Sequence, residues 1–145
     1  MARWYDGAMG EVRAKVRLYN HIDEALASEG HLKSEKIRTY EADALIDSGA
    51  VRTVIPSFVF DALGLKSSGS AVAEYADGRK DTVPKAYGMR VEIMGRDTTD
   101  DASVLGDEVL IGQSVLEKLD LQIDCHRQRL IPNPAHPDQP VSRVK

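Results

Sequence analysis

The most constraining feature of this sequence is a polar turn between two apolar segments, in residues 41–58, EADALIDSGAVRTVIPSF. The first apolar segment, residues 44–46, runs directly into Asp47-Ser48-Gly49, and the second follows at residues 54–56. Both segments favour burial, whereas the carboxylate and the hydroxyl need water or hydrogen-bond partners. Gly49 permits a tight turn and a close approach of the backbone to another chain or ligand. We therefore expect two buried walls that carry an accessible loop.

Composition describes an ordinary globular domain and excludes several classes of protein. The chain has 145 residues, of which 42% are hydrophobic and 29% charged, and its formal net charge is −4. A mildly acidic chain without a long basic block is a poor candidate for binding nucleic acid. No apolar segment is long enough to span a membrane, and the first residues lack the apolar core of a signal peptide. The single cysteine, Cys125, cannot form an internal disulfide, so we expect a cytoplasmic protein.

Alternation of apolar and polar residues predicts that short strands make up most of the chain. We expect strands over residues 10–18, 36–46, 109–111, 121–123 and 129–132. Two further strand-like arms between Ser70 and Ile93 flank Asp77-Gly78, a pair typical of a type I′ hairpin turn. Residues 98–107 are polar and acidic, and they predict a loop.

Capping residues predict three short helices between these strands. One helix follows Asn20, its expected N-cap, and ends at Gly30. A second covers residues 57–65, with Ser57 as its N-cap and Gly64 at its C-terminal stop. A third covers residues 115–119. The fold class is therefore all-β with short helices, a compact barrel or sandwich rather than a parallel α/β sheet.

The Asp-Ser-Gly turn has a clear chemical interpretation only if two copies meet. One Asp alone is a weak device for hydrolysis, and by itself this tripeptide is most often an ordinary turn. Two carboxylates about 3 Å apart cannot both ionise, so they share a proton. One then acts as a base toward water while the other donates to the carbonyl oxygen.

Five motifs occur in a fixed order: ALIDSGAVRTVIP, the helix SFVFDALGL, the hairpin AEYADGRKDTVP, then EVLIGQSVLEKLDLQID and the closing strand RQRLIPNP. In this order they resemble the retropepsin-like aspartic proteases, most closely the small prokaryotic members. The resemblance covers about residues 10–132, so we assign residues 1–132 to one domain. It implies a closed β-barrel protomer with one active-site loop and one flap hairpin. It also implies an aspartic endopeptidase that needs no cofactor.

The resemblance assigns a role to each residue of these motifs. Asp47 would be the catalytic carboxylate. The residues expected to support the active-site loop are Ser48, Gly49, Ala50, Thr53, Leu110, Ile111 and Gly112. The residues expected to bind substrate are Gly49, Ala50, Val51, Arg52, Tyr75, Ala76, Asp77 and Gly78. For Tyr75, packing on its own hairpin is a second interpretation.

The number of Asp-Ser-Gly triplets predicts the assembly. The chain has one such triplet, so a mechanism with two carboxylates requires a C₂ homodimer with Asp47 of each subunit at the axis. The expected partners are a second copy of the chain and a peptide or protein substrate. The proline-rich residues 133–145 are expected to be disordered or to supply an interface strand.

The sequence departs from the retroviral pattern beside the active-site triplet. Retroviral members have an Asp and an Arg that form a buried ion pair where this chain has Val51 and Gln113. Losing both partners together can be nearly neutral, whereas losing one strands a buried charge. Arg52 lies beside the expected cleft. It either favours acidic residues in the substrate or is an exposed arginine on a turn.

Two other functions remain open on the sequence. The chain could be a catalytically weak or inactive module for dimerisation or peptide binding, since a fold does not establish a function. It could also be a structural β-barrel subunit of a larger assembly. We expect no metal site, because Cys125-His126 and the other histidines lack zinc-ligand spacing and the acidic residues 97–108 lack the EF-hand order.

Overall fold

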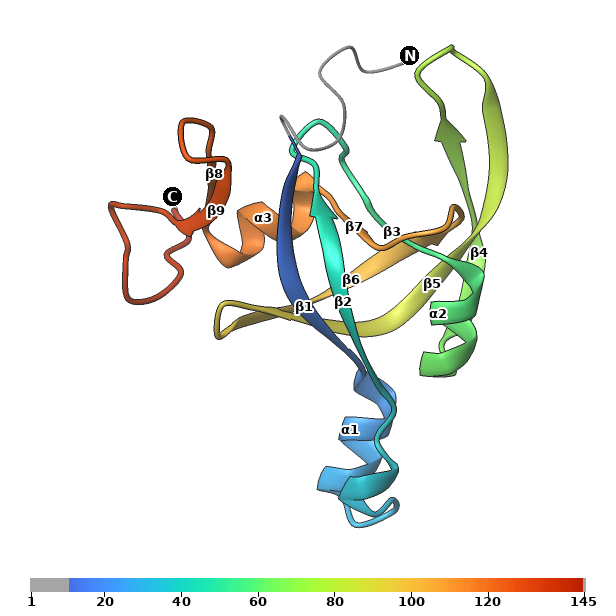
Figure 1. Cartoon of the computed structure of the whole chain (residues 1–145). Coiled ribbons are helices and arrows are strands. Elements are labelled where there is room, and N and C mark those ends of the chain that lie inside the picture. The colour runs from blue at the N-terminus through green and yellow to red at the C-terminus, as the bar shows by residue number, and fades with distance from the viewer. Residues whose placement is uncertain (1–10, 145) are drawn as a thin grey trace.

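The computed structural model describes residues 11–144, which form a mostly β domain with short helices (Figure 1). The strands are β1 (Val12–Asn20), β2 (Thr39–Ile46), β3 (Thr53–Ile55), β4 (Lys66–Glu74), β5 (Lys80–Ile93), β6 (Arg96–Val104), β7 (Leu110–Ile111), β8 (Leu121–Asp124) and β9 (Arg129–Pro132). The helices are α1 (His21–Ser28), α2 (Ser57–Leu63) and α3 (Gln113–Leu119), with a short 3₁₀ turn at Ser34–Lys36. None of the helices formed by these residues has the length and apolar character needed to cross a bilayer.

Seven of the strands form one mixed sheet in the order β1-β2-β7-β3-β6-β5-β4. The pairs β2–β7 and β3–β6 are parallel, and the remaining neighbours are antiparallel. Strand β1 also pairs with β5, from Arg17 opposite Glu92 to Asn20 opposite Met89. Strands β8 and β9 form a separate two-stranded sheet. Strands far apart in the sequence, β2, β7 and β3, are thereby placed side by side.

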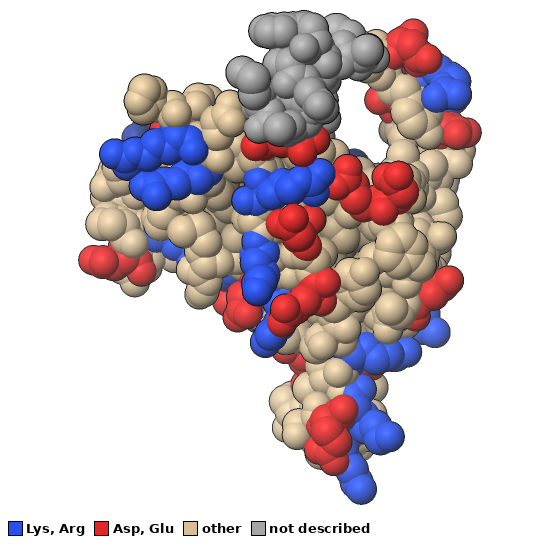
Figure 2. All heavy atoms as spheres, in the orientation of Figure 1, with Lys and Arg blue, Asp and Glu red and all other residues tan. Residues whose placement is uncertain are grey.

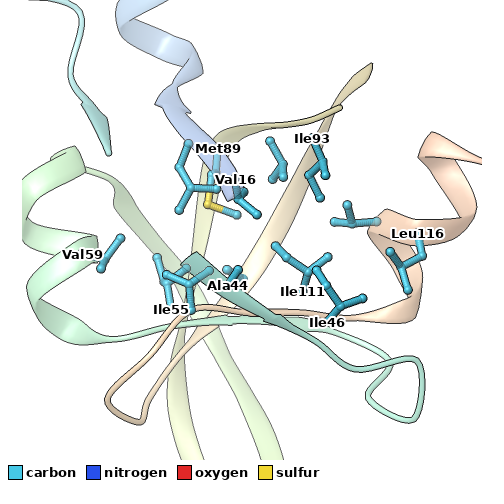
Figure 3. Packing of buried hydrophobic residues seen from close by; sticks show 14 of the residues in the cluster. Val16, Ala44, Ile46, Ile55, Val59, Met89, Ile93, Ile111 and Leu116 are labelled. Carbon is cyan, nitrogen blue, oxygen red and sulfur yellow. The ribbon is translucent and has the colours of Figure 1, made fainter. Parts of the chain in front are cut away.

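The core forms because alternate residues of the strands point inward. In β1, Val16 and Leu18 are fully buried whereas Arg13 and Arg17 are exposed. Figure 3 shows the inward residues of several strands and helices converging: Val16, Ala44, Ile46, Ile55, Val59, Met89, Ile93, Ile111 and Leu116. Burial of this apolar surface is the main favourable term in folding. It fixes the strands that precede and underlie the Asp-Ser-Gly turn.

The predicted boundaries at Asn20 and Gly64 are confirmed, whereas the predicted cap at Ser57 is wrong. Asn20 caps α1 as expected, because its side chain accepts a hydrogen bond from the Asp23 amide at 2.9 Å. Gly64 ends α2 in the left-handed conformation, with φ of +61°. Ser57, however, is the first helical residue rather than the cap. Pro56 precedes the helix with an extended backbone, and its carbonyl accepts the first helical hydrogen bonds.

The prediction of a loop over residues 98–107 is wrong for most of that segment, because β6 covers Arg96–Val104. Met94 and Gly95 have φ values of +55° and +76°, which is the type I′ pattern. This turn reverses the chain and pairs β6 with β5. Ala102 and Val104 are buried, and Asp100 is half-buried and binds Ser114 and Lys118 of α3, so the acidic composition of the segment concealed the strand.

The predicted hairpin is confirmed as β4–β5, but the predicted type of its turn is wrong. Among residues 75–78 only Gly78 has a positive φ, of +87°, whereas a type I′ turn at Asp77-Gly78 needs two. The Gly78 amide donates to the Tyr75 carbonyl at 2.9 Å, and the Tyr75 amide donates to the Arg79 carbonyl at 2.8 Å. The connection is therefore a three-residue turn that ends in a glycine bulge.

Residues 133–144 form neither helix nor strand, and they are tied to the end of α3. The Asp120 carboxylate accepts hydrogen bonds from the Asn133 side chain at 3.0 Å and the Val141 amide at 3.1 Å, and it contacts His136 Nδ1 at 2.6 Å. Hydrogen bonding, foremost from Asn133, holds the pKa of Asp120 below its usual value. Arg96 adds a hydrogen bond to the His136 carbonyl at 2.8 Å. The segment thus lies against its own protomer.

Asn20 is a specific point at which the fold can be tested. It is buried, caps α1, and donates through Nδ2 to the Leu63 carbonyl at the end of α2 at 2.8 Å. We expect Asn20→Ala to lower the free energy of unfolding by about 2 kcal/mol, because a cap is lost and a buried carbonyl is left unpaired. Urea denaturation measures this. Gln122→Ala, which truncates an exposed amide on β8, should change stability by less than about 0.5 kcal/mol.

Two ion pairs of α1 predict how stability depends on pH. Hydrogen bonds from Arg38 and Arg90 hold the pKa values of Asp23 and Glu24, respectively, below their usual range. A carboxyl whose pKa is lowered on folding stabilises the protein above its unfolded-state pKa, and this contribution is lost as the pH falls through the folded-state value. Unfolding free energy should therefore be insensitive to these groups between about pH 5 and 7 and decrease below about pH 4.

Urea denaturation from pH 2.5 to 7 tests this pH dependence. In Glu24→Gln, the loss of unfolding free energy between pH 7 and pH 2.5 should be smaller than in wild type by about 1 kcal/mol. The reason is that Glu24 binds Arg90 through two hydrogen bonds in a partly buried ion pair. Glu29→Gln removes an exposed carboxylate with no ion pair among residues 11–144 and should leave the slope unchanged. Equal slopes for wild type and Glu24→Gln would contradict the assignment.

Candidate active site

The Asp-Ser-Gly turn lies where three strands meet. Strand β2 ends at Ile46, directly before Asp47, and β3 begins shortly after the turn. Strand β7 lies between them, because Leu110 pairs with Leu45 on one side and with Val54 on the other. The two apolar segments that flank the turn in the sequence therefore flank one buried strand in space. This arrangement confirms the expectation that the turn has buried walls.

Asp47 is held at the tip of these walls by main-chain contacts. Its amide donates to the Ile111 carbonyl of β7 at 3.0 Å. Its Oδ1 accepts a hydrogen bond from the Gly49 amide at 2.9 Å, and its carbonyl accepts one from the Ala50 amide at 3.2 Å. The carboxylate is half-buried, and the neighbouring Ser48 is exposed, with no hydrogen-bond partner for its hydroxyl within residues 11–144. One carboxylate oxygen is thus fixed in direction while the group stays accessible.

The start of α3 secures the second half of the loop. The Gln113 amide donates to the Ala50 carbonyl at 2.7 Å, and the Ser114 amide donates to the Val51 carbonyl at 3.0 Å. The first amides of a helix have no partner within the helix, so these two bonds also satisfy the end of α3. The loop and the helix therefore fix each other.

Gly112 and Thr53 bring β7 and the loop into direct contact. A Cβ placed on Gly112 would lie 2.5 Å from the Arg52 carbonyl oxygen and 2.9 Å from the Val51 oxygen, so no side chain fits there. Thr53 is fully buried, and its Oγ1 lies 3.4 Å from the Gly112 amide as an acceptor. Both residues were expected to support the loop, and the structure brings them together.

The positions of the missing retroviral ion pair leave no buried charge behind. Val51 is 75% exposed, and Gln113 donates to Glu117 of its own helix at 3.4 Å. The loop is instead held by the backbone bonds described above. Uncharged residues at both positions are therefore consistent with an intact loop.

A hollow of about 620 Å³ separates this loop from the β4–β5 hairpin. Figure 2 shows the hairpin standing away from the rest of the molecule with open space beneath it. Six residues predicted to bind substrate line the hollow: Gly49, Ala50, Val51, Arg52, Tyr75 and Ala76. Asp77 and Gly78 do not line it, because they form the outer part of the turn. The side chain of Tyr75 also packs beneath Arg79, whose guanidinium lies 4.4 Å from the ring centre.

Sequence reasoning missed half of the residues that line this hollow. They are Val54, Val72, Ala73, Glu74, Ser103 and Leu105. The apolar β3 segment was predicted only as a wall, and the β4 residues were predicted only as a hairpin arm. Ser103 and Leu105 belong to the segment predicted as a loop. No alternation marked them, because Ala102, Ser103 and Val104 are all buried and Leu105 follows the last residue of β6.

The functional groups that the described residues bring to the site are carboxylates and hydroxyls. No group of three or more His, Cys, Asp or Glu side chains within residues 11–144 is arranged to bind a metal ion. The chemistry that the described residues offer is proton transfer by Asp47 beside an open, partly apolar hollow. No protein-family model matches the chain, and no curated protein matches its sequence.

Gly112 provides a test of how the loop is supported. We expect Gly112→Ala to lower the unfolding free energy by about 3 kcal/mol, because the new methyl group meets backbone atoms that cannot move without separating β7 from the loop. Thermal and urea denaturation measure this. Gly106→Ala, at φ of +77° with no atom within 4 Å of the added carbon, should cost about 1 kcal/mol from backbone strain alone. Equal losses in the two variants would contradict the close contact.

Proposed function

We propose that this chain is a retropepsin-like aspartic endopeptidase that acts as a homodimer. The observation that carries the proposal is the placement of Asp47. Its backbone is fixed by β7, its carboxylate is accessible, and the loop that bears it borders the hollow beneath a hairpin. Asp47 does not itself line the hollow, but Gly49, whose amide binds the Asp47 carboxylate, does. An extended peptide in the hollow would therefore pass the loop that bears the carboxylate. The order of the motifs along the sequence supports the same assignment.

The pairing of the strands supports the closed-barrel protomer that this proposal includes. Strands β1, β2, β7, β3, β6 and β5 follow one another in the sheet, and β5 also pairs with β1. Pairing between the first and the sixth strand supports closure of the sheet into a barrel. Strand β4 continues outward from β5 and forms, with its hairpin turn, the proposed flap.

A second copy of the chain is needed to complete the site. One protomer supplies one Asp-Ser-Gly carboxylate, and efficient hydrolysis by this chemistry needs two that share a proton. A C₂ axis beside Asp47 would bring the second carboxylate from an identical subunit. The exposed Ser48 hydroxyl, which has no partner within residues 11–144, is available to donate across such an axis.

The proposed reaction needs no cofactor and forms no covalent enzyme intermediate. The ionised carboxylate takes a proton from water as the water oxygen bonds to the peptide carbonyl carbon. The protonated carboxyl gives its proton to the carbonyl oxygen. Collapse of the resulting diol breaks the C–N bond as the nitrogen takes a proton from the protonated carboxyl and the other carboxylate takes a proton from one diol hydroxyl. This leaves a carboxylic acid and an amine and restores the single shared proton of the pair. The two carboxyls titrate jointly, so peptidase activity should peak at mildly acidic pH.

The proposed cellular setting is the cytoplasm. Cys125 is exposed and free, and it is the single cysteine of the chain. A small domain without disulfides fits a reducing compartment. The net charge of −4 favours a peptide or protein partner over a nucleic acid.

Mixing subunits tests the shared active site. Wild type and Asp47→Asn, which keeps the side-chain size and removes the ionisable carboxyl, are refolded together from urea in equal amounts. Random pairing would leave about one quarter of the dimers with two intact carboxylates. Cleavage of a peptide library should therefore fall to about 25% of the all-wild-type rate. Independent active monomers would retain about 50%.

Controls for the mixing experiment separate the alternatives. Light scattering should give the mass of a dimer for both proteins, and Asp47→Asn alone should cleave nothing. Full cleavage by Asp47→Asn would overturn the role of Asp47. Peptide binding by both proteins without cleavage by either would favour the dimerisation or peptide-binding module.

A further inference from the structure

Arg52 combines a fixed backbone with an unpaired side chain. Its carbonyl lies against Gly112, where a Cβ would come within 2.5 Å, and β3 begins at the next residue. The preceding residue, Val51, is held by the Ser114 amide of α3. Arg52 is exposed and lines the hollow, and its guanidinium has no ion pair or hydrogen bond within residues 11–144. The backbone of Arg52 is therefore fixed in space, whereas its guanidinium is free to bind a ligand.

The hollow contains one other charged side chain, Glu74 on the hairpin. Glu74 pairs in register with Lys80 on the neighbouring strand, so an opposite charge stands directly across from it. Arg52 has no such neighbour among its strand partners, because it precedes β3. The charge of the hollow that is not offset locally is therefore positive.

The rest of the hollow is largely apolar and uncovered. Val51 is 75% exposed and Val72 is 68% exposed, and both face the hollow together with Val54 and Leu105. Exposed apolar surface gathered in one concavity is typical of a binding site rather than of ordinary surface. A ligand that matches it has an apolar side chain and, beside it, a negative charge.

We propose that Arg52 makes this site selective for peptides that carry Asp or Glu next to an apolar residue. The guanidinium offers a planar fork of donors that fits a carboxylate with two parallel hydrogen bonds. The apolar side chain occupies the surface formed by Val51, Val54, Val72 and Leu105. The selectivity deepens the proposed peptidase function, on which it rests for the identity of the ligand as a peptide.

The fixed backbone makes this contact more favourable than an ordinary surface ion pair. Binding normally requires the ordering of a flexible residue, which costs free energy. Here the main chain of Arg52 is already held, so only its side chain must be ordered. We expect an acidic peptide to bind about fivefold more tightly than its amide counterpart, and we expect this ratio to fall as salt is raised.

The test measures binding separately from cleavage. Full-length Asp47→Asn is titrated with fluorescein-labelled octapeptide pools that share an apolar residue and differ beside it in one fixed residue: Glu, Gln or Lys. Fluorescence anisotropy gives each dissociation constant. The Glu pool should bind about fivefold more tightly than the Gln pool on the parent protein. Adding Arg52→Gln should abolish that ratio, and adding Arg52→Glu should reverse the preference toward Lys.

A matched control separates a local contact from net charge. Arg127→Gln makes the same change of charge in the turn between β8 and β9, away from the hollow, and should leave the fivefold ratio intact. Thermal melts establish that each variant is folded. An equal ratio in the parent protein and in Arg52→Gln, or no peptide binding by the folded parent, overturns the proposal.

The same data keep this inference apart from the proposed peptidase function. Cleavage by wild type together with binding that ignores the fixed residue would refute the role of Arg52 and leave the peptidase intact. Acid-selective binding that depends on Arg52, without cleavage by wild type, would support the inference and refute the peptidase.

Discussion

The structure of the site depends on the insertion of β7 between β2 and β3. Leu110 is the residue that joins them, since it pairs with Leu45 and with Val54. Without this strand, the two segments that flank the Asp-Ser-Gly turn would have unpaired backbone groups in the core, which is costly. Because Gly112 and α3 follow β7 at once, the same insertion also delivers the amides that hold the loop. The strand pairing that completes the core therefore also fixes the geometry of the active-site loop.

The fold could be predicted from the sequence where a local signal and a burial pattern agreed. Asn20 offered both a cap and a following helix, and the Asp47 turn stood between two apolar segments that the structure buries or half-buries. The prediction failed where the two signals conflicted. The segment 98–107 contains three aspartates, so its composition concealed the strand that pairing with β5 imposes. Turn types were missed for a similar reason, since Asp77-Gly78 fits two kinds of hairpin and the pairing decides between them.

In the candidate site, too, residues within one local motif could be predicted, whereas residues brought there by tertiary folding could not. Asp47, Gly49 and Arg52 could be identified because they lie in one short motif. Leu105 and Val72 could not, because they reach the hollow from just after β6 and from β4 only once the sheet has formed. A single sequence therefore predicts the active-site loop better than it predicts the residues that line the hollow. The loop is one continuous segment, whereas the lining residues come from several strands.

The two sides of the hollow differ in how firmly they are held, and this difference bears on how a peptide would be bound. The loop side is fixed by β7 and α3. The hairpin side contains β4, which pairs only with β5 among the described strands, and from Lys66 to Ser70 its residues are all exposed. Segments with few buried contacts open at low free-energy cost. A ligand would therefore order the hairpin against a loop that is already in place, and selectivity would come mainly from the loop side, where Arg52 lies.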